Sequence, residues 1–294
     1  MLSRCFDPMP SIVCLWSTRS PSGRNLDPAQ DESITDRITS LVTVQCVLLH
    51  MISKSELKFI RSLKIKKYRV AEKCFLVEGE KNVLELLNTG YKIRRLLVTK
   101  DFLNKYKKRI ESLSFCEVGV KDLTSVSSFV TNDQAVALVE STDFTINDLN
   151  LSSGIFVLDG IRDPGNLGTI IRTLDWFGFD QLVCSLDSAE LYNPKVISAT
   201  MGSFVRVKTV YCELGEFLSN YEGVKIGAEM AGNSIDDFTC EQPYLIVMGS
   251  ESHGISGSIQ ELLDRRVTIQ KYGGAESLNV GVATGIICHS LLAK

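Results

Sequence analysis

Three polar loops in the second half of the sequence hold the residue types that could perform chemistry. The first, residues 158–172, contains a Pro-Gly turn followed by Asn166 and, six residues later, Arg172. Asn166 offers a donor and an acceptor near a predicted helix start, and Arg172 lies about one turn into that helix beyond Gly168. The two side chains can therefore converge on one bound group. A helix cap beside an unrelated surface arginine explains this loop, taken alone, equally well.

The second loop, residues 249–255, follows an apolar run and reads Gly-Ser-Glu-Ser-His-Gly-Ile. Its glycines expose backbone groups, and Glu251 adds a carboxylate. His253 would suit a general base only with a positioned acidic or hydroxyl partner, so we interpret it as a loop residue. The second loop thus offers backbone and carboxylate groups for binding.

The third loop, residues 269–280, has two adjacent glycines and then the run Ser277-Leu278-Asn279. Paired glycines favour a tight backbone turn, and Ser and Asn are typical residues at a helix N-terminus. We therefore expect Ser277 and Asn279 at the start of a helix, where they are available to a ligand.

These loops require a framework, and the second half of the chain predicts one. Short apolar runs alternate with helical patterns, as is typical of a parallel α/β sheet. The expected strands are 155–158, 181–184, 205–210, 225–228, 244–248 and 266–269, and the expected helices are 168–177, 194–201, 214–219, 256–263 and 277–292. In such sheets ligands bind beyond the carboxyl ends of the strands, which is where the first loop lies. Dinucleotide-binding and P-loop glycine motifs are absent from the sequence.

The first half predicts a smaller α/β domain. Its expected strands are 74–77, 93–98, 115–118 and 135–139, and its expected helices are 80–87, 102–113 and 122–129. An amphipathic helix capped by Ser53 should precede them and extend its apolar face to Ile65. We expect domains at 51–140 and 154–294, joined by a polar linker at 141–153.

Residues 1–50 hold four of the seven prolines and lack periodicity. We expect an irregular extension, with Met51 as the functional start. A targeting peptide is the competing interpretation, but the segment lacks both a strong apolar stretch and an Arg-rich, acid-poor composition.

The net charge of -3 conceals a strongly basic segment. Residues 51–110 carry 17 Lys and Arg against 6 Asp and Glu, or +11, and such a segment could follow a phosphate backbone. A solvated helix face is the alternative. The proposed RNA-binding cations are Lys64, Lys66, Lys67, Arg69, Arg94 and Arg95.

Cysteine and histidine usage indicates the compartment and the chemistry. Nine scattered cysteines without a Cys-x-x-Cys pair favour a reduced, cytoplasmic protein with single buried thiols. Three histidines make a His-rich zinc site improbable, so we expect metal-free chemistry. The longest apolar stretch is far shorter than the roughly 20 residues of a membrane span.

Taken in order, the three loops resemble the motifs of the SpoU (TrmH-like) family of SPOUT RNA 2'-O-ribose methyltransferases. The matching residues are Asn166, Gly168 and Arg172 in the first motif, Gly249, Ser250, Glu251 and Gly254 in the second, and Ser277 to Val280 in the third. The run 193–202 is similar to the Asn-Pro-Lys helix of the family. Residues 53–140 resemble its auxiliary RNA-binding domain, which is shaped like a kink-turn-binding ribosomal protein.

The resemblance implies a SPOUT domain with a parallel sheet and a deep C-terminal trefoil knot, a homodimer, and S-adenosylmethionine as cofactor. It places Gly249, Ile269 and Leu278 at the cofactor, although this chain has Gln270-Lys271 where the family often has Pro-Met.

The resemblance also implies site roles for five residues. In the family the arginine of the first motif is assigned as the base. A guanidinium holds its proton strongly, so we expect Arg172 to bind phosphate and orient the substrate. The residues expected to position the ribose, the loops and Arg172 are Asn166, Glu251, Ser277 and Asn279.

The expected function is methylation of a ribose 2'-oxygen in RNA. The separate RNA-binding domain favours ribosomal RNA over transfer RNA by analogy. A noncatalytic RNA-binding protein that keeps the knotted fold is an alternative, disfavoured by the intact motif residues. A transferase for a small molecule is another, disfavoured by the +11 segment.

Overall fold

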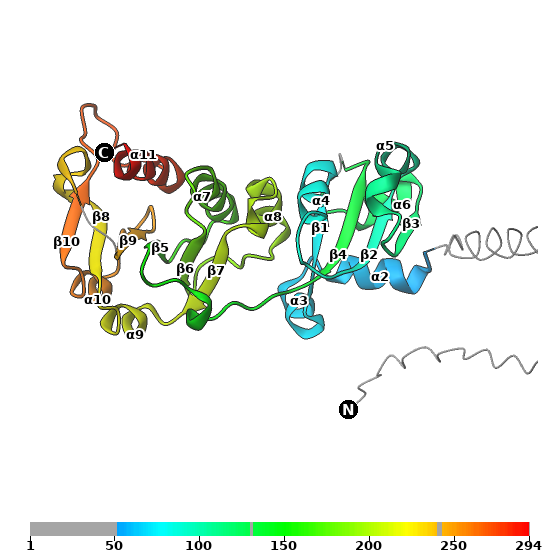
Figure 1. The fold of residues 1–294 in the computed structure, drawn as a ribbon, viewed down its shortest axis with the longest axis horizontal. Helices are drawn as coiled ribbons and strands as arrows, with labels where there is room; N and C mark the ends of the chain where they lie inside the picture. Colours follow the sequence, from blue (N-terminus) through cyan, green and yellow to red (C-terminus); the bar gives the residue numbers. More distant parts are fainter. Residues whose placement is uncertain (1–51, 130–131, 240–242, 294) are drawn as a thin grey trace, which may run out of the picture. The chain divides into compact units, whose positions relative to one another are not determined.

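The computed structural model describes residues 52–129, 132–239 and 243–293, all within one compact unit, His50–Lys294. The predictions for residues 1–50 lie outside this part of the chain. The described chain contains two sheets with their helices, which we call the N-terminal region, residues 52–140, and the C-terminal region, residues 154–293 (Figure 1).

The N-terminal region is a four-stranded mixed sheet with helices. Its strands are β1 (Cys74–Glu78), β2 (Ile93–Val98), β3 (Phe115–Glu117) and β4 (Ala135–Glu140), in the order β1-β4-β2-β3. Strand β4 runs antiparallel to β1 and β2, whereas β2 and β3 are parallel. The helices that follow β1, β2 and β3 are α4 (Glu80–Leu86), α5 (Lys100–Ile110) and α6 (Val120–Val126). All four predicted strands and three predicted helices are confirmed within a few residues.

The leading amphipathic helix is shorter than the sequence predicts. Ser53 caps α2 (Lys54–Ser62) as expected, because its hydroxyl accepts a hydrogen bond from the Glu56 amide at 3.1 Å. The helix ends at Ser62, however, and Ile65 is 56% exposed at the start of a second helix, α3 (Lys66–Glu72). The inclusion of Ile65 in the apolar face was therefore wrong.

The C-terminal region is a six-stranded sheet in which every neighbouring pair is parallel. Its strands are β5 (Gly154–Asp159), β6 (Gln181–Ser185), β7 (Lys208–Cys212), β8 (Val224–Ser234), β9 (Tyr244–Gly249) and β10 (Arg265–Thr268), in the order β10-β8-β9-β5-β6-β7. Strand β9 therefore lies between β5 and β8, which places the first and second predicted loops side by side at the carboxyl edge of the sheet.

Helices cover both faces of this sheet (Figure 1). The helices are α7 (Pro164–Trp176), α8 (Pro194–Thr200), α9 (Leu214–Ser219), α10 (Gly257–Gln260) and α11 (Val280–Leu292). Strand β5 shows the alternation expected of a two-sided sheet. Phe156 and Leu158 pack into the core beneath α7, α8 and α11, whereas Ile155 and Val157 pack into the core beneath α9 and α10.

Some predicted boundaries differ from the structure. Strand β7 begins at Lys208 rather than at residue 205, because Gly202 at φ +98° is followed by a 3-10 turn over Ser203–Val205. Helix α10 has four residues where eight were expected. Helix α11 starts at Val280, with Asn279 as its N-cap.

Five cysteines lie in the described ranges, and none of them forms a disulfide with another. They are Cys74, Cys116, Cys184, Cys212 and Cys288. Burial raises the pKa of each thiol, to about 11 for Cys212 and about 12 for Cys288. Within the described ranges no helix combines the length and apolar character needed to cross a membrane.

Candidate active site

Three side chains, one from each predicted loop, meet at the carboxyl edge of the six-stranded sheet. Asn166 Nδ2 donates to Glu251 Oε1 at 2.8 Å, and Asn279 Nδ2 donates to the same oxygen at 2.7 Å. Asn279 Nδ2 also lies 2.9 Å from Asn166 Oδ1, which it reaches as a second donor. We call these three residues the Asn–Glu–Asn cluster. The cluster joins segments up to 113 residues apart in the sequence.

Local sequence places each member of the cluster. Asp163 is the N-cap of α7 and accepts from the Asn166 amide at 2.8 Å, with a proline at the first helical position. Asn279 caps α11 by accepting from the Gly281 amide at 3.0 Å. The first turns of α7 and α11 thus present Asn166 and Asn279 to Glu251.

Two motif glycines are required by close packing. A Cβ at Gly168 would lie 2.5 Å from the Ala199 Cβ, so glycine allows α7 to approach α8. A Cβ at Gly249 would lie 2.1 Å from the carbonyl carbon of Gly254, across the turn that carries Glu251. The first glycine therefore supports helix packing, and the second permits the tight loop.

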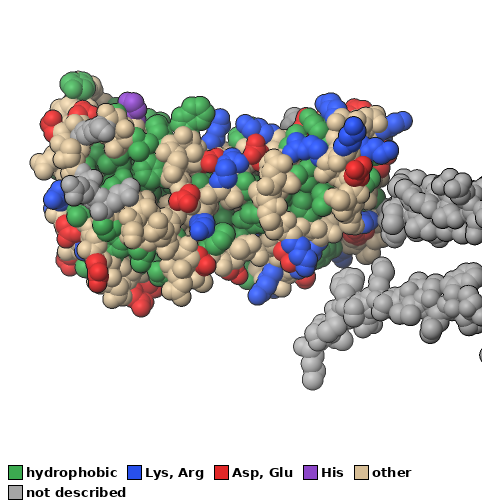
Figure 2. All heavy atoms as spheres, in the orientation of Figure 1, with side chains coloured by type: hydrophobic (Ala, Val, Ile, Leu, Met, Phe, Trp, Pro, Cys, Tyr) green, Lys and Arg blue, Asp and Glu red, His purple; other side chains and the backbone are tan. Residues whose placement is uncertain are grey.

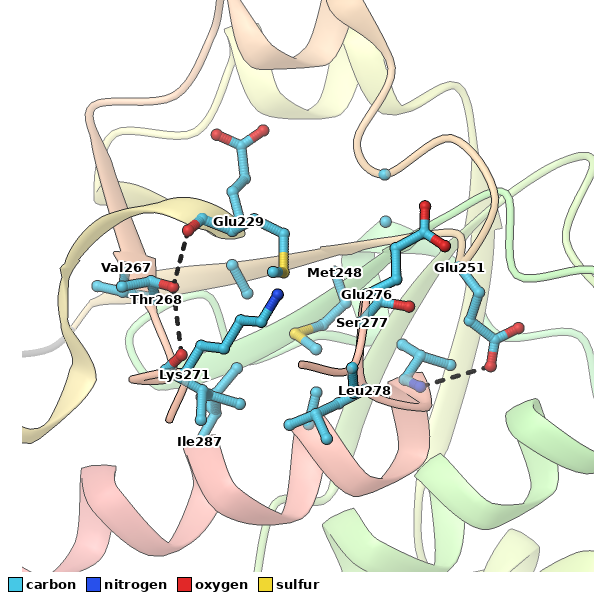
Figure 3. A pocket seen from close by; sticks show the side chains of 18 of the residues that line it. Glu229, Met248, Glu251, Val267, Thr268, Lys271, Glu276, Ser277, Leu278 and Ile287 are labelled. Atoms are coloured by element: carbon cyan, nitrogen blue, oxygen red, sulfur yellow. Dashed lines mark hydrogen bonds between the residues drawn. The ribbon is translucent and has the colours of Figure 1, made fainter. Parts of the chain in front are cut away.

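Beside the cluster lies a cleft of about 440 Å³, which we call the main cleft (Figure 3). Its walls come from the middle of β8, the ends of β9 and β10, the loop 269–278 and the first turns of α11. All three residues predicted to contact the cofactor, Gly249, Ile269 and Leu278, line it together with Glu251 and Ser277. The second and third motifs therefore build one concave site.

Several lining residues were missed by sequence reasoning. Glu229, Met248, Lys271 and Ile287 line the main cleft, and Figure 3 shows Lys271 pointing into it, with Glu229 on one side and Ile287 on the other. Glu229 lies in the long strand β8, and Ile287 lies two turns into α11, both outside the motifs. Lys271 lies in the third loop. The only sign of its importance in the sequence is that this chain has Gln270-Lys271 where the family often has Pro-Met.

A second, polar cleft of about 440 Å³ lies on the other side of Glu251. Its lining includes Asp159, Arg162, Asp163, Asn166 and His253, together with Ser250 and Glu251, which it shares with the main cleft. His253 is exposed in the turn after β9, which agrees with its interpretation as a loop residue, although its Nδ1 does lie 2.7 Å from the hydroxyl of the adjacent Ser252. Glu251 thus stands between an apolar and a polar cleft.

Arg172 is exposed on α7, outside the lining of both clefts. Among the described residues no carboxylate forms an ion pair with it. Asn193, from the Asn-Pro-Lys run, caps α8 by accepting from the Lys195 amide at 2.9 Å. Asn193 therefore stabilises the start of α8. The Arg172 guanidinium remains available to bind an anion.

The six predicted RNA-binding cations differ in their surroundings. Lys66 and Lys67 are exposed, and the Lys64 ammonium donates to the Ser127 carbonyl at 2.5 Å. The two arginines of β2 are each paired with a carboxylate: Arg94 with Glu140 at 2.9 Å, and Arg95 with Glu56 at 3.3 Å. On the face in Figure 2, Lys and Arg side chains gather over the N-terminal region.

Arg69 does not lie on this surface. The sequence predicts an RNA contact there, but the Arg69 side chain is 4% exposed and forms an ion pair with Glu190 at 2.6 Å. Its partner follows 121 residues later, so no local pattern could reveal the pair. We therefore remove Arg69 from the residues proposed to touch RNA.

Fold and site together define an α/β protein with a small-ligand cleft at the carboxyl edge of a parallel sheet. Comparison with known families refines this class. Residues 153–289 match the model of the SpoU rRNA Methylase family, and residues 54–137 match the model of the MRM3-like substrate binding domain.

Individual relatives agree. The 23S rRNA (guanosine(2553)-2'-O)-methyltransferase RlmP of Bacillus subtilis is 28% identical, over 79% of this chain and 93% of that protein. The 23S rRNA (guanosine-2'-O-)-methyltransferase RlmB of Blochmanniella floridana is 30% identical, over 69% of this chain and 80% of its own. The AdoMet-bound rRNA methyltransferase structure from Sinorhizobium meliloti superposes with a TM-score of 0.74 at 26% identity, covering 82% and 95% of the two chains. The chain belongs to the SpoU rRNA Methylase family.

Proposed function

We propose that this protein is an S-adenosylmethionine-dependent methyltransferase that modifies a ribose 2'-oxygen of ribosomal RNA. The observation that carries the proposal is the Asn–Glu–Asn cluster, which joins the three family motifs beside a cleft of ligand size. The names of the relatives RlmP and RlmB support ribosomal RNA as the substrate class.

The main cleft fits the proposed cofactor. Its volume of about 440 Å³ falls in the usual range for small-molecule sites, roughly 300–1,000 Å³. Apolar side chains such as Met248 and Ile287 suit an adenine ring, and the carboxylates of Glu229 and Glu276 suit the cationic end of the molecule. Gly249, Ile269 and Leu278 would hold it through the loops after β9 and β10. When bound, the cofactor supplies a methyl group activated on a sulfonium.

The residues of the chain would align the substrate and dispose of a proton. In-line attack requires that the 2'-oxygen be held on one line with the methyl carbon, and the hydroxyl proton must leave. We assign Arg172 to an RNA phosphate, because its guanidinium is exposed and unpaired within the described residues. The cluster fixes the loops around Ser277, and surrounding water can accept the proton.

The polar cleft is the proposed place of the target nucleotide. It shares Glu251 with the main cleft and contains Asn166, so a ribose there would lie beside both the cluster and the cofactor. Its donors and acceptors suit a base edge.

Several finer features are proposed on the family resemblance. We propose a trefoil knot in the C-terminal region, a kink-turn-binding type of N-terminal domain and a homodimer whose knots pack together. The matches at 54–137 and 153–289 support domains at 51–140 and 154–294, a linker at 141–153 and a separate extension at 1–50. The absence of disulfides among the described cysteines supports a cytoplasmic location.

Tritiated methyl transfer tests the proposal. The wild-type protein should transfer label from S-adenosylmethionine to unmodified ribosomal RNA in preference to transfer RNA, and nuclease digestion should yield 2'-O-methylated nucleosides. Preferred labelling of transfer RNA would show that transfer RNA, and not ribosomal RNA, is the substrate class. Tight RNA binding without labelling of either RNA would favour a noncatalytic RNA-binding protein.

A further inference from the structure

Helix α3 presents unpaired cations and an aromatic ring on its exposed surface. Lys66 and Lys67 lie in its first turn, and Lys73 follows its last residue. Within the described ranges none of these lysines forms an ion pair, unlike the arginines of β2. Tyr68 is 43% exposed beside them. Cations that can bind phosphates, next to a ring that can stack on a base, suit single-stranded RNA.

The one buried residue of α3, Arg69, attaches the helix to the C-terminal region. Its Nη2 and Nε donate to the two carboxylate oxygens of Glu190, at 2.6 and 3.1 Å. Its Nη1 donates to the carbonyls of Leu63 and Lys64, each at 2.9 Å, just after the end of α2. A bidentate arginine–carboxylate contact of this kind fixes the orientation of the two side chains as well as the distance between them.

Further contacts reinforce this attachment. The rings of Phe75 and Tyr192 stack at 4.2 Å, joining β1 to the segment that follows Glu190. Elsewhere, Arg206 of the C-terminal region pairs with Glu85 of α4 at 2.7 Å. The two regions also share one continuous hydrophobic core. The N-terminal region is therefore held in a defined place rather than tethered only by its linker.

We propose that α3 is a docking helix for the substrate RNA and that the Arg69–Glu190 pair fixes this helix relative to the Asn–Glu–Asn cluster. Arg69 and Glu190 are then positioning residues that determine which ribose reaches the site, although neither touches RNA. This inference rests on the proposed RNA methyltransferase function and adds to it the place where the RNA binds and how that place is held.

Salt-dependent RNA binding separates docking from positioning. The probe is an in-vitro transcript of the large-subunit ribosomal RNA of the source organism, bound to the full chain in a filter assay. The double variant K66A/K67A should lower the slope of log affinity against log salt by about 1.4, or about 0.7 for each single-strand phosphate contact removed. Arg69→Met should leave this slope unchanged, because the buried guanidinium meets no phosphate. Arg61→Met is the matched control for Arg69→Met, because it also replaces an arginine by methionine, on the neighbouring helix α2.

The rate of RNA methylation then tests whether Arg69 and Glu190 position the bound RNA. Arg69→Met should lower kcat on the same transcript by about tenfold or more, since misplaced RNA reacts poorly, and should shift the mapped methylation sites. Arg69→Lys should be faster than Arg69→Met but slower than the wild type, because an ammonium cannot form the bidentate contact. Affinity for S-adenosylmethionine, measured by calorimetry, should match that of the wild type. Glu190→Gln, which preserves shape, should reproduce the effect in milder form and serves if Arg69→Met fails to fold.

Specific outcomes would overturn the inference. An unchanged salt slope in K66A/K67A would remove α3 from the RNA surface. Wild-type kcat and wild-type site selection in Glu190→Gln and in folded Arg69→Met would remove the positioning role. A wild-type protein that binds the transcript without methylating it would instead refute the proposed enzymatic function, and the salt slopes would still decide whether α3 docks RNA.

Discussion

Asn279 performs two tasks that substitution can separate. Its Oδ1 caps α11 by accepting from the amides of Gly281 and Val282 at 3.0 and 3.4 Å, while its Nδ2 donates to Asn166 and Glu251. Loss of an N-cap costs about 1 kcal/mol, and loss of each exposed side-chain hydrogen bond about 0.5–1 kcal/mol. Asn279→Ala is therefore expected to lower the free energy of unfolding by about 2–3 kcal/mol.

Two assays separate these tasks. Since 1 kcal/mol shifts the melting temperature of a protein of this size by about 2–4 °C, calorimetry should show Asn279→Ala melting about 4–12 °C lower. Asn279→Ser keeps a capping oxygen and should recover about 1 kcal/mol of the loss. It cannot bridge the cluster, so its methyl transfer should stay about 100-fold below wild type, the usual effect of a displaced site.

The control is Asn104→Ala, an exposed position on α5, which should change neither the melting temperature nor the activity. Wild-type turnover in Asn279→Ser would refute the argument that the cluster organises the site. An unchanged melting temperature in Asn279→Ala would refute its capping role.

Three further predictions concern other parts of the chain. Arg172→Ala should abolish methyl transfer while calorimetry shows nearly unchanged cofactor affinity, and retained turnover would remove Arg172 from the mechanism. Gly249→Ala should weaken cofactor binding at least about tenfold, because the new methyl group would clash with the Gly254 carbonyl carbon and distort the loop; wild-type affinity would show that this loop is not part of the cofactor site. Burial alone would raise the pKa of Asp175, but hydrogen bonds led by that from Arg206 hold this pKa below its ordinary value. The stabilisation is therefore complete above the ordinary pKa of about 3.9 and is lost as pH falls through the lowered value. Asp175→Asn should melt lower than wild type at pH 7, with a difference that shrinks below about pH 4; a constant difference would contradict this linkage.

The sequence could predict the parts of the site that depend on local chemistry. Asn166 and Asn279 stand at helix starts, where capping chemistry is readable from the sequence, and Glu251 follows a short apolar run whose length favours a buried strand. Parallel sheets gather such loops at one edge, so the convergence follows from the fold class.

The remaining features depend on packing between distant segments. Glu229 and Ile287 reach the main cleft from the middle of regular elements, where an alternating or helical pattern shows burial but not the neighbour. Arg69 adjoins exposed lysines in sequence, and only the fold brings Glu190 to it. Charge counting identifies a basic segment, but it cannot distinguish a cation that faces solvent from one that is paired with a carboxylate in the interior.

The central claim is that this chain methylates a ribose of ribosomal RNA through the site built on the Asn–Glu–Asn cluster and Arg172. The most direct test maps 2'-O-methyl groups in RNA from cells with and without the gene. We expect that a methylation of ribosomal RNA disappears without the gene, returns with the wild-type gene, and does not return with Arg172→Ala. An unchanged methylation map of ribosomal RNA in cells lacking the gene would contradict it.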